Sequence, residues 1–151
     1  MSEFQVVICQ LGDESYGLDI GSVYEIIRFQ SSTAVPTAPN FVDGVINLRG
    51  RIIPVMDLSS RFGLKRGAAT KSTRIIVAGT GGVRVGLVVD AVTEVLMVAD
   101  DAVEPTPDVV AGRDSRYIRG IAKLADQLVI LLDLGVLFSE QTAMEVAARA
   151  A

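Results

Sequence analysis

The feature of this sequence that most limits its fold is a segment that occurs twice. Residues 44–58, GVINLRGRIIPVMDL, align without a gap with residues 120–134, GIAKLADQLVILLDL, at an offset of 76. Residues 16–27 align in the same way with residues 85–96, at an offset of 69. This pattern indicates an internal duplication, with halves at about residues 16–58 and 85–134. Each half is predicted to hold about five strands with small helices, enough to close a small barrel.

The segment 41–58 is predicted to be a β-hairpin. Its two β-branched runs are separated by Arg49 and Gly50, which is the composition of a strand, a tight turn and a second strand. Asp57 follows the second run and is predicted to cap a short helix, as is its copy Asp133. Val23, Ile26 and Ile27 have the spacing of one helix face, so a short helix that starts after Ile20 and includes residues 23–27 is expected. A terminal helix is expected from Leu134.

Composition narrows the class of protein. Half of the 151 residues are apolar but only 5% are aromatic, so a core of valine, isoleucine and leucine is expected, in a single domain over residues 1–151. The net charge of −4 lacks the basic excess that nucleic-acid binding requires. No apolar run approaches the length of a membrane span, so direct membrane insertion is not expected. The single cysteine, Cys9, is predicted to be a buried thiol in a protein of the reducing cytosol.

The sequence offers little for catalysis. It contains no histidine, which removes the commonest general base and metal ligand. Asp57, Asp90 and Asp133 each follow an apolar strand, and a small metal-dependent barrel enzyme using Asp57 or Asp90 is one alternative. Capping explains Asp57 and Asp133 better, because they are copies of one position. We therefore expect no catalytic residue, no metal site and no cofactor.

Exposed apolar residues are then the remaining candidates for function. Val23 and Val92 occupy equivalent positions of the repeat, and both could flank a groove at the junction of the two halves that accepts a partner helix. The alternative, which spacing alone favours, is that both are ordinary core residues. Glu25 and Arg49 could form an ion pair at the rim of that groove, or remain two solvated charges.

Several of these segments resemble the bacterial chemotaxis coupling protein family, CheW. The matching segments are GDESYGLDI, VYEII, VPTAPNFVDGVINLRGRIIPVMDL and VGLVVDAVTEVL, within residues 4–138. The resemblance implies a mainly β fold: two intertwined five-stranded SH3-like β-barrels around a shared apolar core, with short helices including a C-terminal one.

The resemblance also implies a non-catalytic adaptor that joins the cytoplasmic tips of chemoreceptors to the regulatory domain of the histidine kinase CheA. Such a protein is cytoplasmic and is recruited to membrane-associated receptor arrays. The alternative is a CheW-like adaptor of a non-chemotactic kinase pathway, such as surface motility. The residues implied for receptor binding are Val7, Ile20, Val23, Ile26 and Val92, with the charges Glu25 and Arg49. Those implied for a kinase-facing edge are Ile75, Val77 and Gly86.

Overall fold

The structure is a computed structural model, and it describes residues 2–36, 42–62, 68–80, 83–105, 117–124 and 126–137. Strands make up most of this part of the chain. The elements are β1 (Glu3–Leu11), β2 (Glu14–Asp19), the 3-10 helix η1 (Ile20–Ser22), β3 (Val23–Arg28), β4 (Val42–Leu48), β5 (Arg51–Asp57), α1 (Leu58–Arg61), β6 (Arg74–Thr80), β7 (Val83–Val89), β8 (Ala91–Ala99), the 3-10 helix η2 (Asp100–Ala102), β9 (Val103–Glu104), β10 (Ile118–Leu124) and β11 (Gln127–Leu132).

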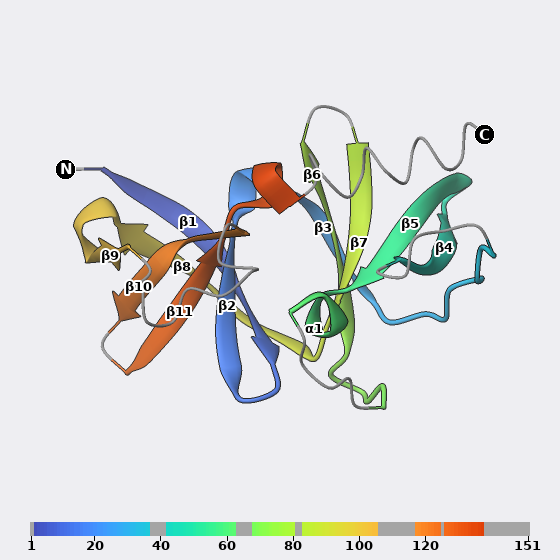
Figure 1. Ribbon diagram of the computed structural model, residues 1–151, viewed down its shortest axis with the longest axis horizontal. Coiled ribbons are helices and arrows are strands. Elements are labelled where there is room, and N and C mark those ends of the chain that lie inside the picture. Colours follow the sequence, from blue (N-terminus) through green and yellow to red (C-terminus); the bar gives the residue numbers. More distant parts are fainter. Residues whose placement is uncertain are drawn as a thin grey trace.

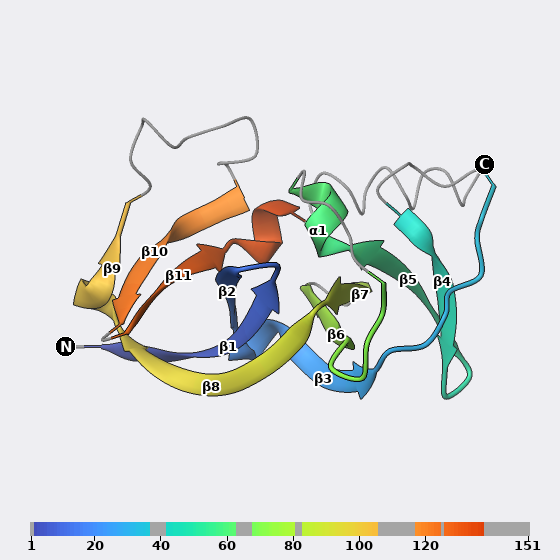
Figure 2. The same cartoon turned by 90° about the horizontal axis from the view of Figure 1, so that it is seen from below.

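The strands form two curved sheets that lie side by side (Figure 1, Figure 2). The first has the order β8-β1-β2-β11-β10-β9 and the second the order β3-β6-β7-β5-β4. Each sheet therefore combines a hairpin from one half of the chain with strands from the other half. The prediction of a mainly β, intertwined fold is confirmed, although the first sheet has six strands because the short β9 pairs with β10.

The two sheets repeat one pairing scheme. In β4 and β5, Gly44 lies opposite Val55 just after a register shift, and in β10 and β11, Gly120 lies opposite Leu131 just after the equivalent shift. The parallel pairs correspond as well: β5 joins β7 with Val55 beside Gly86, and β11 joins β2 with Leu131 beside Gly17. The offsets of 76 and 69 residues in the sequence are therefore also offsets between equivalent backbone positions.

Alternation along the strands divides the interior into three apolar clusters. In β1, Val7 and Cys9 belong to a central cluster that holds residues of both sheets, whereas Val6 and Ile8 belong to a cluster inside the first sheet. A third cluster lies inside the second sheet. The central cluster is the shared apolar core that the sequence predicted, and it extends from β1 and β2 to β6, β7, Leu134 and Leu137.

The predicted helix over residues 23–27 is wrong, because these residues form strand β3. Val23 pairs with Ala78 and Glu25 pairs with Val77, so Tyr24 is an extra residue in a β-bulge. Beyond the bulge, Ile26 lies opposite Ile76, which faces the central cluster as Ala78 does. A bulge thus puts residues three apart on one face of a strand, which imitates the spacing of a helix.

The aspartates that follow the strands hold the chain where it changes direction. Asp57 accepts a hydrogen bond from the Ser59 amide at 2.9 Å, at the start of α1. Asp133 accepts one from the Val136 amide at 3.0 Å, where a helical turn covers residues 134–137. Both capping predictions are confirmed, as is the start of a C-terminal helix. The alanine-rich tail beyond this turn lies outside the described residues.

Candidate functional site

Strands β3 and β8 form the outer edge of one sheet each, and both carry apolar side chains on the face of the central cluster. β8 has the same bulge as β3: Ile8 pairs with Glu94 and Cys9 with Val92, so Thr93 is the extra residue. As a result Val92 and Val95 share a face, just as Val23 and Ile26 do in β3. The two edges are thus built in the same way.

We call these four side chains, Val23, Ile26, Val92 and Val95, the edge apolar surface. Val23 and Val92 are partly buried, and both pack against the central cluster. Ile26 and Val95 remain 39% and 44% exposed. The structure therefore brings the repeat-equivalent valines to the same cluster, with more exposed apolar neighbours beside them. Val23 and Val92 therefore lie against the core, and Ile26 and Val95 add exposed apolar area at each edge that is available to a partner.

The other residues implied for receptor binding lie at different depths. Ile20 is 38% exposed in η1, which Asp19 caps by accepting a hydrogen bond from the Gly21 amide at 2.8 Å. Val7 is buried in the central cluster, opposite Val95 on the neighbouring strand. Its side chain is not available for direct contact, so Val7 supports the edge apolar surface from below.

The predicted ion pair between Glu25 and Arg49 is present. Arg49 sits at the tip of the β4–β5 hairpin with a left-handed φ of 51°, and Gly50 follows with a φ of 84°. The Asn47 side chain closes this turn by accepting a hydrogen bond from the Gly50 amide at 2.8 Å. Arg49 is 69% exposed and Glu25 28% exposed, so the pair contributes little to stability. Glu25 precedes Ile26 in β3, and its side chain starts from the opposite face of the strand.

The residues implied for a kinase-facing edge are placed differently from expectation. Ile75 and Val77 are fully buried in the second sheet, and β6 and β7 are interior strands rather than an edge. A Cβ atom added to Gly86 would lie 2.9 Å from Ile75 Cγ2, so the side chain that approaches this glycine comes from the same chain. The edge location is therefore wrong, and packing between β6 and β7 explains the glycine.

The sequence did not identify two exposed apolar residues of β8, Val95 and Met97, as candidate site residues. Met97 lies opposite Gln5 and is 54% exposed. The signal was present in the repeat, because Val95 is the equivalent of Ile26 at the offset of 69. The sequence pattern of residues 83–98 predicts one long strand with bends near Gly86 and Asp90. The structure ends β7 at Val89 and begins β8 at Ala91, whereas the bulge at Thr93 is not visible in that pattern.

The described residues contain no group of three or more metal-ligating side chains. Asp57 and Asp90, the carboxylates of the alternative enzyme, both bind backbone amides, Asp57 that of Ser59 and Asp90 that of Gly12 at 2.7 Å. Burial raises the pKa of the Cys9 thiol to about 12, and the charge of Asp90 adds to this, so the thiol stays protonated. No helix in the described ranges has the length and apolar character to cross a membrane.

Residues 5–142 match the CheW-like domain family. The chain is 38% identical to the probable chemotaxis protein CheW of Rhizobium etli over 136 residues, 90% of this chain and 88% of that protein. It is 32% identical to the chemotaxis protein CheW of Treponema pallidum over 149 residues, 96% of this chain and 88% of that protein. The crystal structure of the scaffolding protein TtCheW from Thermoanaerobacter tengcongensis superposes with a TM-score of 0.82 at 41% identity, covering 91% of this chain and 89% of that one.

The fold and these similarities place the chain among the non-catalytic scaffold proteins of chemotaxis. The chain belongs to the CheW family.

Proposed function

We propose that this protein couples the cytoplasmic tips of chemoreceptors to the regulatory domain of the histidine kinase CheA. The observation that supports this most directly is the edge apolar surface, where two equivalent edge strands present apolar side chains over one core. An adaptor needs such exposed binding surfaces and no catalytic machinery. The protein would act in the cytoplasm, at receptor arrays on the membrane.

The receptor-binding site in this proposal comprises the edge apolar surface together with Ile20, Glu25 and Arg49. Ile26 and Val95 would contact the apolar face of a receptor helical hairpin, since an amphipathic helix buries such residues on binding. The Glu25–Arg49 pair, which starts from the other face of β3, would set the orientation of the helix from the rim of the interface, because charges at the rim contribute more to specificity than to affinity.

The kinase-binding site in this proposal lies on the second sheet. Ile75 and Val77 are buried there, so they would act by holding the shape of strands β6 and β7 rather than by touching the kinase. Gly86 would act in the same way, since it permits close packing of Ile75. The kinase would then contact exposed side chains of this sheet.

The experiment is a titration of purified protein with a receptor cytoplasmic hairpin and, separately, with the CheA regulatory domain. Ile26→Asp and Val95→Asp each place a charge on a side chain that is already partly exposed, so both variants are expected to fold. We expect at least tenfold weaker receptor binding and unchanged kinase binding. The matched control is Leu128→Asp on β11, where the side chain is 62% exposed and away from both edges.

A third variant in the same series is Val92→Asp, which is expected to abolish receptor binding while the protein stays folded. Val92 packs against the central cluster, so this variant is also expected to lose some stability. Unfolding of Val92→Asp would show that Val92 is core, and the two more exposed variants keep the test valid. If neither fragment binds the unmodified protein, the proposed coupling role is wrong, and an adaptor of a non-chemotactic kinase becomes the better hypothesis.

A further inference from the structure

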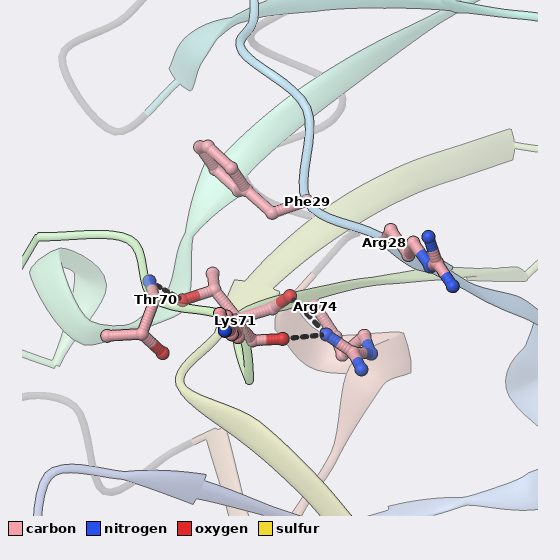
Figure 3. Close-up of a pocket in the computed structure, with 6 residues that line it drawn as sticks. Arg28, Phe29, Thr70, Lys71 and Arg74 are labelled. Carbon is pink, nitrogen blue, oxygen red and sulfur yellow. Dashed lines mark hydrogen bonds between the residues drawn. The ribbon is translucent and has the colours of Figure 1, made fainter.

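Among the residues that the structure describes, three cations and no carboxylate line a shallow pocket on the second sheet. Its lining residues are Arg28 at the end of β3, Phe29, and Thr70, Lys71, Thr73 and Arg74 at the start of β6 (Figure 3). The cavity volume is about 450 Å³. This is the volume of roughly fifteen water molecules, far more than one small ion fills.

The two arginines lie directly opposite each other. Arg28 and Arg74 are paired in the register of β3 and β6, so their side chains start from the same face of the sheet. Like charges at directly opposed positions of an antiparallel pair destabilise the pairing. At the equivalent position of the other half, β8 has the uncharged Met97. The repulsion is therefore a property of this edge alone.

The guanidinium of Arg74 is fixed by the backbone. It donates to the Lys71 carbonyl at 2.8 Å and to the Thr73 carbonyl at 2.9 Å (Figure 3). The turn that carries these carbonyls is itself closed, since the Thr73 hydroxyl accepts from the Thr70 amide at 2.9 Å. Two neutral carbonyls orient this cation but leave its charge uncompensated.

Three other exposed cations of the described residues have acidic partners, while Arg84 lies over the Tyr24 ring at 4.2 Å. Arg49 pairs with Glu25, Arg119 with Asp19 at 4.0 Å, and Lys123 with Glu104 at 3.4 Å. Within the described ranges, the three cations of the pocket form no ion pair. The chain as a whole has a net charge of −4, but this pocket is locally positive and would attract a negatively charged group.

We infer that Arg28, Lys71 and Arg74 form a docking site for an acidic segment of a protein partner. Carboxylates suit the site because arginine binds them through paired N–H donors, and several side chains on one segment would fill a cavity of this size. Phe29 gives the pocket an apolar wall for the segment's methylene groups. The negative charge of the whole chain disfavours an extended polyanion such as nucleic acid. This inference goes beyond the coupling role and does not depend on the edge apolar surface.

The test is an NMR titration of the whole protein with a tetraglutamate peptide at about 50 mM salt. Binding is measured from the changes in the backbone amide chemical shifts of the protein. We expect shifts centred on residues 28, 71 and 74, and an affinity that falls as salt is raised to about 300 mM. The variant Arg28→Met with Arg74→Gln should lose at least tenfold in affinity. Lys123→Gln, which removes an exposed cation elsewhere, should bind the peptide normally.

Three results would overturn the inference: no shift at the pocket, equal binding by the double variant, or binding of tetraglutamine as strong as that of tetraglutamate. Binding of inorganic phosphate without binding of the peptide would also overturn it, by showing a phosphate site instead. Val95→Asp, on the edge of the other sheet, should weaken receptor binding but bind tetraglutamate normally. The failure of this inference is therefore distinguishable from a failure of the coupling role.

Discussion

The two edge strands, β3 and β8, share a backbone but differ in charge. Both are bulged at the same place, and both put two apolar residues over the central cluster. Yet Glu25 in β3 has a partner in Arg49, whereas the residue equivalent to Arg49 in the second half is Ala125. Arg28 is likewise replaced by Met97. The repeated positions build the scaffold, and the positions that differ give each edge its own chemistry.

The largest expected effect concerns the two bulge glycines that the halves share. A Cβ atom at Gly44 would lie 2.3 Å from the Thr33 carbonyl oxygen, which belongs to rigid backbone. At Gly120 the nearest atom is Val103 Cγ1 at 2.7 Å, a side-chain atom that is able to move, with the Glu104 carbonyl oxygen at 2.8 Å. We expect Gly44→Ala to cost about 3 kcal/mol of unfolding free energy and Gly120→Ala about 2 kcal/mol.

Urea unfolding of both variants at one pH checks this order. The matched control is Gly12→Ala, where the added Cβ meets nothing within 4 Å, although a φ of 62° still favours glycine. Equal losses at Gly44 and Gly120 would mean that the two bulges tolerate a side chain equally, so that the halves are more alike than their contacts indicate.

Much of this scaffold was predictable because it rests on repeated, local signals. The hairpin at residues 41–58, its repeat at residues 120–134 and the caps at Asp57 and Asp133 follow from apolar alternation and turn residues, whereas the shared core was implied by the family resemblance. The strand β3 was not predictable in the same way. Its bulge depends on pairing with β6, about fifty residues later in the chain, and a single-strand pattern contains no record of that partner.

A smaller effect concerns Cys9, whose equivalent in the other half is Ala78. Cys9→Ala should cost about 1 kcal/mol at pH 7, because a buried sulfur is lost from the central cluster. Burial raises the pKa of the folded thiol from 9.0 to about 12, so its contribution is complete below pH 9 and is lost as the pH rises toward 12. At pH 10 the thiol of the unfolded chain ionises first, which costs the unmodified protein about 1.4 kcal/mol.

Urea unfolding at pH 7 and pH 10 therefore gives a sharp result: the deficit of Cys9→Ala should disappear at pH 10. Burial, then Glu14 and lastly Cys9 raise the pKa of Tyr16 well above its ordinary value, so Tyr16 stays protonated in both folded proteins at pH 10 and adds little to the difference between them. A deficit that is the same at both pH values would show that the thiol ionises in the folded protein as readily as in the unfolded chain.

The candidate site was only partly predictable, for a different reason. Val23, Ile26 and Val92 and the Glu25–Arg49 pair were identified, and the structure brings the three apolar residues to one face of the two edges. Ile75 and Val77 were placed at an edge, but their burial depends on neighbours from β3 and β7. Apolar residues of β-strands look alike in sequence whether they face a core or a partner.

The smallest expected change in stability belongs to Arg49, and it separates structure from function most clearly. Arg49→Ala gives the first hairpin the residue that the second has, and Arg49→Glu reverses the charge beside Glu25. Both should change the unfolding free energy by less than about 1 kcal/mol, because the pair is exposed and screened by solvent. Receptor binding should be weaker for Arg49→Ala and weakest for Arg49→Glu, because Glu25 loses its partner in the first variant and faces a like charge in the second.

A large fall in the melting temperature of Arg49→Ala would contradict this, and would make the ion pair a structural feature of the β3 edge. Unchanged binding with unchanged stability would instead show that this charge difference between the two edges is not used for recognition.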